Sequence, residues 1–593
     1  MSRFKYWNIL IPVVAAFAVF FGFLGIKSLM GQGENKTEIE LYDGKNVRLV
    51  IGADLIALKN PPIIRDNEIA IDTDTVRTYF DPNLFWDPDT KKVTVTTKDR
   101  LIRMNTGNLE TFVNDEEITL NLPAFEEAGT VYLPMKFLSE YYQINIHYND
   151  VSMVVMIDEK NTVIQKAKII LDGAVIRNGR SIKEPIVKRY ADINSPQELY
   201  VFEHYDNWYK VRSEEGVIGY IEKKFVSVSM YVHEVALRDT RDSIWKPDRG
   251  KISMVWEQVN AVNPNVGEIG EMPGLDVVSP TWFDLTGVDG EVGSKASAEY
   301  INWAHNKGYK VWALFRNNSN DIEMTSAFLN DGDARAKAIR SVLAYASMLE
   351  IDGINLDFEN VYLKDKDMLT QFVRELAPML REQGLTFSVC VNIPDGSDNW
   401  SKCFDSPRIA EAADYIVVMA YDQTGTSSNH AGSVAQLDWV ETNIRKLVER
   451  DGIPPERVIL GMPFYIRLWE METDSDINGR ILNTKAIYMR TAINLALDNH
   501  ADIVWEERSG QFYCEYKSEG KIYRMWLEEP YSLNMKSSLV HKYNLAGISA
   551  WCREFEIPEA WDVINRNMKQ IVSYIQWQDE AYVEEPRLER LRE

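Results

Sequence analysis

Cysteine and histidine are scarce in this chain, which contains four Cys and seven His among 593 residues. The cysteines, Cys390, Cys403, Cys514 and Cys552, show no CxxC spacing and no clustered histidine, so the sequence argues against a zinc site. Four cysteines are also too few to build a scaffold of this length from disulfides. Cys390 and Cys552 lie in apolar runs and are expected to be small buried residues, while a pairing among the four stays open.

Positive charge is also in short supply, because 65 Lys and Arg face 89 Asp and Glu, for a formal net charge of -24. Such a surface repels phosphate backbones, anionic lipid headgroups and polyanionic wall polymers. Nucleic acid is therefore not an expected partner, and a neutral or weakly charged ligand fits better. Aromatic side chains are plentiful and include 16 Trp, which suit stacking on sugar rings and equally suit ordinary core packing.

One long apolar run stands near the N-terminus. Residues 9–26 (ILIPVVAAFAVFFGFLGI) form 18 consecutive uncharged residues, long enough to cross a bilayer as a helix. Arg3 and Lys5 precede the run and a largely acidic stretch follows it, so the positive-inside rule leaves the tip in the cytoplasm. The sequence therefore predicts a single-pass cell-membrane protein, with residues 1–30 as cytoplasmic tip and transmembrane anchor. A cleaved signal peptide is the alternative, although no Ala-x-Ala-like site and no lipoprotein cysteine follows the run.

A chain of 593 residues requires several domains, because single cores stop growing near ~250–300 residues. After a short polar linker at 31–42, residues 43–160 show short β segments with one or two helices, and 74–95 weakly repeats as 129–156. This segment resembles the copper amine oxidase N-terminal-like domain, an α+β stalk module. Its single histidine, His147, leaves too few ligands for copper, so we expect a spacer.

Residues 163–228 resemble a bacterial SH3-like domain, a small β-barrel. Trp208, Lys210 and Arg212 alternate along one predicted strand, and Gly219 in the following GVIGYI allows a close backbone approach. The resemblance implies either a module that binds wall peptides or a spacer without a ligand.

Eight strand candidates alternate with helical segments in the C-terminal half of the chain. They are 251–259, 275–283, 309–315, 351–359, 385–393, 414–422, 457–465 and 545–552. Helical stretches such as 334–350 and 366–383 lie between them, so the sequence predicts an α/β TIM (β/α)8 barrel over 245–570. Residues 502–529 predict the antiparallel strands of an inserted small β subdomain, and 571–593 form a charged tail.

The segment DGINLDFE, residues 352–359, carries the most informative pattern. Side chains alternate faces along a strand, so Asn355, Asp357 and Glu359 share one face and the apolar residues between them share the other. Polar residues that point into a barrel make a poor core, because an unpaired buried charge is costly, and active sites lie at the carboxyl ends of barrel strands. With Asp357 charged, Glu359 should hold its proton near neutral pH and could protonate a glycosidic oxygen.

This segment resembles the DxxDxDxE signature of glycoside hydrolase family 18 (chitinase-like), with Asn355 in place of the middle Asp. MAYD (419–422), GMPFYIRLW (461–469) and Trp551 resemble motifs of the family's sixth, seventh and eighth strands. The resemblance implies that Glu359 is the general acid/base, while Asp357 orients and Tyr421 hydrogen-bonds the 2-acetamido group of the substrate. It also implies substrate-binding positions, which are Asp352, Asn355, Met419, Asp422, Tyr465 and Trp551.

The mechanism implied by the resemblance is substrate-assisted, so it needs no protein nucleophile, metal or organic cofactor. Asn355 departs from the chitinase pattern, because it removes a carboxylate that could share a proton with Asp357. GINLDFENV (353–361) and SPTWF (279–283) resemble the branch of spore-cortex N-acetylglucosaminidases. The implied partner is an N-acetylglucosamine-containing polysaccharide, with peptidoglycan as the first hypothesis. The alternatives are a chitinase or endo-β-N-acetylglucosaminidase on chitin oligomers or N-glycans, and a non-catalytic carbohydrate-binding protein on the same fold.

The apolar run at 9–26 generates a prediction about topology. The protein should fractionate with membranes, and protease added to intact protoplasts should remove its large C-terminal part, because only the tip lies inside. Immunoblotting of the two fractions measures this. A soluble form in the medium, whose first residue follows the apolar run, would instead identify a cleaved signal peptide.

Overall fold

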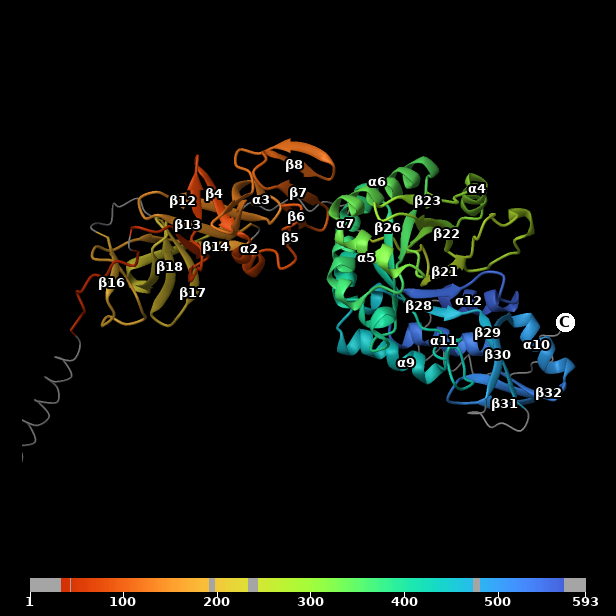
Figure 1. Cartoon of the computed structure of the whole chain (residues 1–593). Coiled ribbons are helices and arrows are strands. Elements are labelled where there is room, and N and C mark those ends of the chain that lie inside the picture. The colour runs from red at the N-terminus through yellow and green to blue at the C-terminus, as the bar shows by residue number, and fades with distance from the viewer. Residues whose placement is uncertain are drawn as a thin grey trace, which may run out of the picture. The chain divides into compact units, whose positions relative to one another are not determined.

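The computed structural model describes residues 33–42, 44–160, 162–190, 198–232, 244–472 and 480–569. By its internal contacts the chain divides into two compact units, one from the N-terminus to Val95 with Ile102–Thr240 and the other from Thr96–Leu101 with the residues from Arg241 onward (Figure 1). The predicted anchor and the charged tail at 571–593 lie outside the described residues. Within the described ranges, no helix is both long enough and apolar enough to cross a bilayer.

The stalk segment contains the predicted internal repeat. Strand β4 (Glu68–Asp72), helix α2 (Thr73–Tyr79) and strands β5 (Phe85–Asp87) and β6 (Lys92–Thr96) recur as β11 (Thr130–Pro134), α3 (Met135–Leu138), β12 (Ile144–Asn149) and β13 (Val154–Glu159). Strands β4 and β11 pair antiparallel, and the two copies share one buried apolar cluster. The remaining strands are β1 (Arg48–Ile51), β2 (Asp54–Ile56), β3 (Ile63–Arg65), β7 (Leu101–Asn105), β8 (Glu110–Val113), β9 (Glu116–Thr119) and β10 (Phe125–Glu127).

The region predicted to be SH3-like forms one seven-stranded sheet in the order β16-β15-β19-β18-β17-β14-β20. These strands are β14 (Val163–Ile169), β15 (Val175–Arg177), β16 (Ile186–Arg189), β17 (Glu198–His204), β18 (Trp208–Ser213), β19 (Ile218–Glu222) and β20 (Val226–Val232). Gly219 makes the predicted close approach, since a Cβ there would lie 2.4 Å from the backbone oxygen of Arg177. The assignment to the SH3-like family stays a prediction.

The segment at 31–42, expected to be a short polar linker, pairs with a sheet edge in its described part. The Ile39 amide donates to the Ile186 oxygen at 2.9 Å, and the Ile186 amide donates to the Thr37 oxygen at 2.9 Å, so the segment adds to the edge strand β16. The buried guanidinium of Arg177 donates to the Asn35 oxygen at 2.8 Å. An unpaired sheet edge offers hydrogen bonds to any extended segment, which is why a polar stretch without strand character in its sequence becomes ordered here.

All eight predicted barrel strands are confirmed. They are β21 (Ile252–Glu257), β22 (Val277–Leu285), β24 (Lys310–Arg316), β25 (Gly353–Asp357), β26 (Thr386–Asn392), β27 (Tyr415–Met419), β28 (Val458–Pro463) and β34 (Gly547–Trp551). Neighbours in the order β21-β22-β24-β25-β26-β27-β28-β34 pair parallel, and β34 pairs with β21 to close the ring. A short strand, β23 (Val292–Ser294), adds antiparallel to β22.

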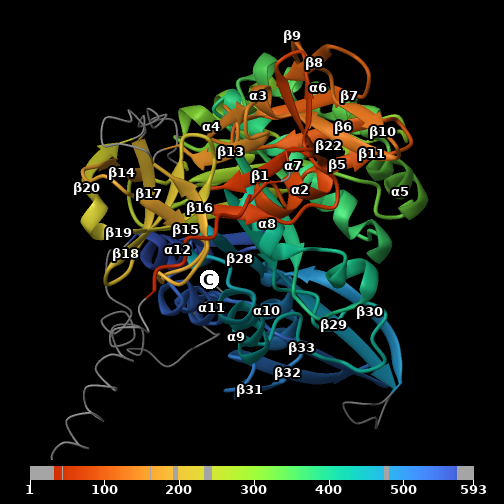
Figure 2. The same ribbon diagram turned by 90° about the vertical axis from the view of Figure 1, so that its left-hand side faces the viewer.

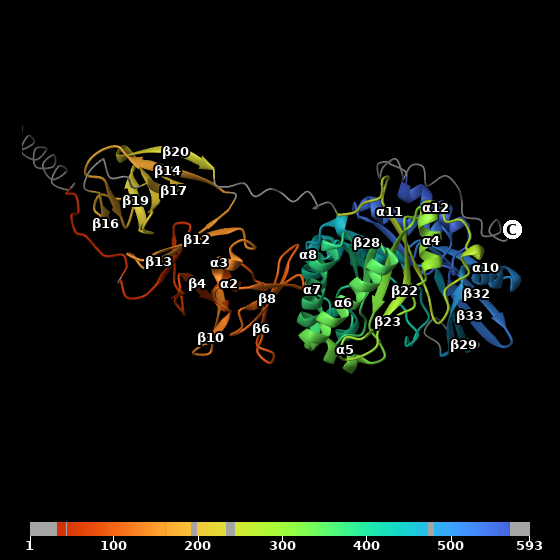
Figure 3. The ribbon, with the colours of Figure 1, turned by 90° about the horizontal axis from the view of Figure 1, so that it is seen from above.

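Helices cover the outside of the barrel, with α5, α6 and α7 packed on one another beside the strands (Figures 1 and 3). The helices of this unit are α4 (Ala298–Asn306), α5 (Ile322–Asn330), α6 (Gly332–Leu349), α7 (Lys366–Glu382), α8 (Ser406–Ala412), α9 (Leu437–Arg445), α10 (Met489–Asp498), α11 (Pro530–Lys542) and α12 (Glu559–Lys569). Ile354, Leu356 and Phe358 are buried against these helices, as the alternation in the sequence predicts. The opposite face of the same strand is left to point into the barrel.

An inserted antiparallel sheet lies between strands β28 and β34 (Figure 2). Its strands are β29 (Tyr465–Glu472), β30 (Ile481–Tyr488), β31 (Asp502–Glu506), β32 (Gln511–Ser518) and β33 (Lys521–Trp526), in the order β30-β29-β33-β32-β31. The insertion begins at Tyr465, much earlier than the predicted 502. Because β29 follows β28 after one residue, the two strands look like one apolar segment in the sequence.

Candidate active site

A cavity of about 300 Å³ opens at the carboxyl ends of the barrel strands. It is lined by Trp256, Asp357, Glu359, Met419, Tyr421, Asp422, Tyr465, Arg467, Ala486, Trp551 and Phe555. Seven of the nine site residues predicted from the sequence are among them: Asp357, Glu359, Met419, Tyr421, Asp422, Tyr465 and Trp551. Residues that are distant in the sequence thus meet at the end of the barrel where active sites of this fold form.

The neighbouring strand holds the backbone of Glu359 in place. The Asn317 side chain, just beyond β24, accepts a hydrogen bond from the Glu359 amide at 2.9 Å and donates one to the Glu359 oxygen at 2.8 Å. Asn317 also donates to the Thr325 hydroxyl at 2.9 Å, so its amide orientation is determined by three partners. The strand that carries the acid ends at Asp357, and this clamp replaces the sheet hydrogen bonds that Glu359 lacks.

The two carboxyl groups differ in their ease of ionisation. Burial, reinforced by the negative charges of Asp357 and Asp422, raises the pKa of Glu359 to about 8, against an opposing effect of Arg316. Burial also raises the pKa of Asp357, to about 6, and Arg316 again opposes it. The two groups interact, so these pKa values belong to the pair. Near neutral pH the site therefore holds one carboxylate and one protonated carboxylic acid side by side.

Aromatic rings form the floor of the cavity. The rings of Trp256 and Trp551 lie 5.8 Å apart, and those of Trp256 and Tyr421 lie 6.4 Å apart at nearly a right angle. Burial raises the pKa of Tyr421 well above its ordinary value, so its phenol remains a neutral hydrogen-bond donor. An aromatic surface with one hydroxyl donor suits a sugar ring that carries an amide substituent.

One wall of the cavity comes from the insertion. The Tyr465 hydroxyl donates to the Asp422 carboxylate at 2.6 Å, and the buried Arg467 guanidinium pairs with the same oxygen at 3.1 Å. Ala486 on β30 and Phe555 beyond β34 complete this wall. Arg467, Ala486, Phe555 and Trp256 were not predicted from the sequence as site residues. Only Arg467 had a signal, since it shares one strand face with Tyr465 two positions earlier.

Two predicted substrate-binding residues do not line the cavity. Asp352 lies at the amino end of β25, where its carboxylate accepts from the Val311 amide at 2.9 Å and pairs with Lys310 at 2.7 Å. Seven residues of extended strand span roughly 23 Å, so the structure places Asp352 far from the cavity that contains Glu359. Asn355 is fully buried beneath the cavity floor, where its Oδ1 accepts from Trp256 Nε1 at 2.9 Å.

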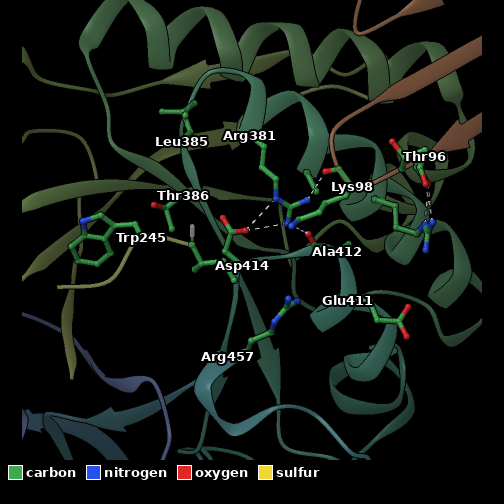
Figure 4. Close-up of a pocket in the computed structure, with 15 residues that line it drawn as sticks. Thr96, Lys98, Trp245, Arg381, Leu385, Thr386, Glu411, Ala412, Asp414 and Arg457 are labelled. Carbon is green, nitrogen blue, oxygen red and sulfur yellow. Dashed lines mark hydrogen bonds and ion pairs between the residues drawn. The ribbon is translucent and has the colours of Figure 1, made fainter. Parts of the chain in front are cut away.

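The opposite end of the barrel also contains a hollow, of about 530 Å³, which Figure 4 shows from close by. Two of its cationic side chains have partners within the barrel. Arg381 pairs with Asp414 at 3.1 Å and donates to the Ala412 oxygen, and Arg457 donates to the Ala410 oxygen at 2.6 Å. These bonds therefore close the barrel at the amino ends of its strands. In this fold, residues at that end contribute to stability.

The site contains carboxylates but offers no evident metal centre. Among the residues that the structure describes, no three His, Cys, Asp or Glu side chains converge as metal ligands would. All four cysteines are buried and unpaired. What the arrangement provides is a proton donor, an adjacent negative charge and an aromatic floor, which together suit acid-catalysed cleavage of a glycosidic bond.

Comparison with known proteins agrees with this chemistry. The family model for glycosyl hydrolases family 18 matches residues 282–556, and the copper amine oxidase N-terminal domain matches residues 50–157. The chain is 25% identical over 290 residues to the uncharacterized glycosylase YvbX of Bacillus subtilis, covering 47% of this chain and 81% of that protein. It is 23% identical over 243 residues to the cortical fragment-lytic enzyme of Bacillus subtilis, covering 40% of this chain and 55% of the relative. It is 25% identical over 328 residues to the di-N-acetylchitobiase of Homo sapiens, covering 49% and 80%.

The match at 282–556 contains the acid, its neighbouring carboxylate and most of the cavity wall. The match at 50–157 spans both copies of the stalk repeat. The barrel of this chain is thus a glycosidase domain of glycosyl hydrolases family 18, and the chain joins it to a copper amine oxidase N-terminal domain.

Proposed function

We propose that this protein is a retaining, substrate-assisted glycosidase that cleaves β-1,4 linkages after N-acetylglucosamine in peptidoglycan. The observation that carries the proposal is the pair formed by Asp357 and Glu359, which share one strand face with one group ionised and the other protonated. A carboxylic acid that stays protonated near neutral pH can donate to the oxygen of a leaving sugar.

The reaction follows from the positions of these groups. Glu359 donates its proton to the glycosidic oxygen as the bond to the anomeric carbon breaks, and the 2-acetamido oxygen of the same sugar bonds to that carbon. The resulting oxazolinium ion is cationic, and the negative charge of Asp357 stabilises it. Glu359, now a carboxylate, removes a proton from water, which attacks the anomeric carbon and restores the acetamido group. Two displacements at one carbon retain its configuration.

The cavity favours the acetamido group as nucleophile over a protein carboxylate. Asp357 and Glu359 project from one strand, so both approach a bound sugar from the same side. Asp422, the third carboxylate of the cavity, is bound by Tyr465 and Arg467 and has its own partners. The Tyr421 hydroxyl lies on the aromatic floor, where it can hold the acetamido oxygen in place during the attack.

Peptidoglycan is supported by the name of a relative and by the sequence branch that this chain resembles. The relative is named a cortical fragment-lytic enzyme, and the resemblance to the spore-cortex branch implies a peptidoglycan substrate. Muramic acid carries a lactyl carboxylate, which the negative charge of Asp357 would repel. We therefore place N-acetylglucosamine in the reacting position, above Asp357, and muramic acid in the leaving position. A membrane anchor would hold such an enzyme close to the cell's own wall.

Chitin oligomers or N-glycans are the second candidate substrate. The di-N-acetylchitobiase relative favours it, because its name states action on an N-acetylglucosamine disaccharide. Such a substrate carries the acetamido group and lacks the lactyl carboxylate. A non-catalytic carbohydrate-binding role is disfavoured by Glu359, because binding alone does not need a carboxylic acid whose pKa is raised.

The first prediction from this mechanism concerns the acid. Glu359→Gln should lower kcat at least ~10²–10⁴-fold while binding of substrate is retained, because Gln has nearly the same shape and cannot donate the proton. In the wild type, activity should fall below pH about 6 as Asp357 gains a proton and above pH about 8 as Glu359 loses one. Initial rates across pH measure both limbs. Near-normal turnover by the Gln variant would refute the assignment.

A second prediction separates substrate assistance from a protein nucleophile. A thiazoline analogue of N-acetylglucosamine, which mimics the oxazolinium ion, should inhibit the wild type competitively. Asp357→Asn should weaken this inhibition, because the charge that stabilises the cation is gone. An active wild type that resists the analogue would instead point to a covalent glycosyl-enzyme.

A third prediction identifies the bond that is cut. Peptidoglycan digested by the protein and reduced with labelled borohydride should yield labelled glucosaminitol, because N-acetylglucosamine occupies the reacting position. Chitin oligomers of matched length are the control substrate, since they lack the lactyl group. Label on muramitol would show that the positions are reversed, and digestion of chitin alone would favour the second candidate.

A further inference from the structure

The polar network beneath the cavity contains no second carboxylate. Asn355 occupies the strand position below Asp357, and an amide cannot give up or share a proton as a carboxyl group does. Asn355 Nδ2 donates to the Ser388 hydroxyl at 2.9 Å, and its Oδ1 accepts from Trp256 Nε1 at 2.9 Å. These two strong bonds determine the orientation of the amide, and they satisfy it without any help from Asp357.

The thiol of Cys390 lies beside Asp357, where a partner that shares a proton with Asp357 would be needed. Strands β25 and β26 pair in parallel with Asn355 opposite Ser388, so the register places Cys390 level with Asp357 on the same face. Cys390 is only 1% exposed. Its Sγ lies 3.3 Å from Asn355 Oδ1, which shows that the thiol points into this network.

The thiol proton of Cys390 can form a hydrogen bond with Asp357. Asn355 Oδ1 already has the shorter bond from the Trp256 indole, so the contact with Cys390 at 3.3 Å is the weaker of the two. Asp357 Oδ1, in contrast, is buried without a hydrogen-bond partner. A buried acceptor without a partner is costly, and a donor that can turn toward it removes that cost. The S–H group has one proton and two acceptors within the same network.

The other charged and titratable groups facing Asp357 do not fill this role. Arg316 on β24 lowers the pKa of Asp357, but its Nε is bound to Asp284 at 2.7 Å and about a third of its side chain is exposed, so solvent screens its effect. Tyr421, two residues beyond β27, lines the cavity, where the substrate would engage it. Glu359 gives its proton to the glycosidic oxygen in the proposed reaction, and once ionised it repels Asp357. Cys390 is the donor that remains among these neighbours.

We propose that Cys390 is a positioning residue for Asp357, whose thiol donates a hydrogen bond to the ionised carboxylate and so replaces the carboxyl partner that Asn355 does not supply. This inference rests on the role of Asp357 in the proposed function. Burial holds the pKa of the thiol well above its ordinary value, so Cys390 remains protonated and acts as a donor, with no nucleophilic part in the reaction. The thiol hydrogen bond lowers the pKa of Asp357 and keeps the carboxylate ionised to lower pH.

The kinetic test compares three variants on chitin oligomers and peptidoglycan fragments. Cys390→Ala should move the acid limb of the kcat profile upward by about one pH unit, a roughly tenfold loss of activity below that limb, because Asp357 loses a donor. Cys390→Ser retains a donor and should restore most of the wild-type limb. Cys514→Ala removes a fully buried thiol from the inserted sheet and should leave the profile unchanged. A uniform loss at every pH, with the acid limb in place, would reduce Cys390 to a packing residue.

A spectroscopic test does not depend on turnover. The S–H stretching band of Cys390, isolated as the infrared difference between wild type and Cys390→Ala, should shift to lower frequency as Asp357 ionises. In Asp357→Asn the band should no longer respond to pH. A wild-type band that ignores pH would overturn the inference even if the enzyme is active. A band that responds in a protein that hydrolyses neither substrate would support the inference and sink the proposed function instead.

Discussion

The burial of Asp357 and Glu359 in one cavity, reinforced by their mutual repulsion, is the constraint on which the rest of the site depends. Two carboxylates on one strand face cannot both ionise easily, and the surroundings decide which one keeps its proton. Arg316 and the buried polar groups below favour the ionised form of Asp357. The negative charge of Asp422 helps to raise the pKa of Glu359. Asn317 then holds the protonated residue in place through its backbone. The strand alternation makes the pair, and the neighbouring strands set its protonation.

Much of this site could be predicted from the sequence, because a period of two residues places Asn355, Asp357 and Glu359 on one face. The eight strands could also be predicted from the sequence, since each is a short apolar run between helical segments. What the sequence could not provide is contact between distant segments. Ala486 reaches the cavity from the inserted sheet and Phe555 from the segment after β34, and neither residue type signals a role. Asn317 shows no motif, since its task is to satisfy two backbone groups on another strand.

Two differences between the sequence-based expectations and the structure have simple geometric causes. Asp352 belongs to the same motif as Glu359, yet the length of an extended strand separates them, so membership in a motif does not ensure a shared site. The segment at 33–42 is polar and lacks strand alternation, yet it pairs with β16 because that strand has a free edge. In both cases the deciding information lies in the partner strand and is absent from the local residues.

The clamp of Asn317 on Glu359 separates the parts of the cavity that must stay from those that are free to diverge. The acid, its neighbour and the aromatic floor all belong to the barrel, whereas Tyr465, Arg467 and Ala486 belong to the inserted sheet. Replacement of the insertion during evolution would change which polymer fits while the proton donor keeps its position. Descendants of one ancestral barrel could in this way keep the same reaction and acquire different polymer substrates.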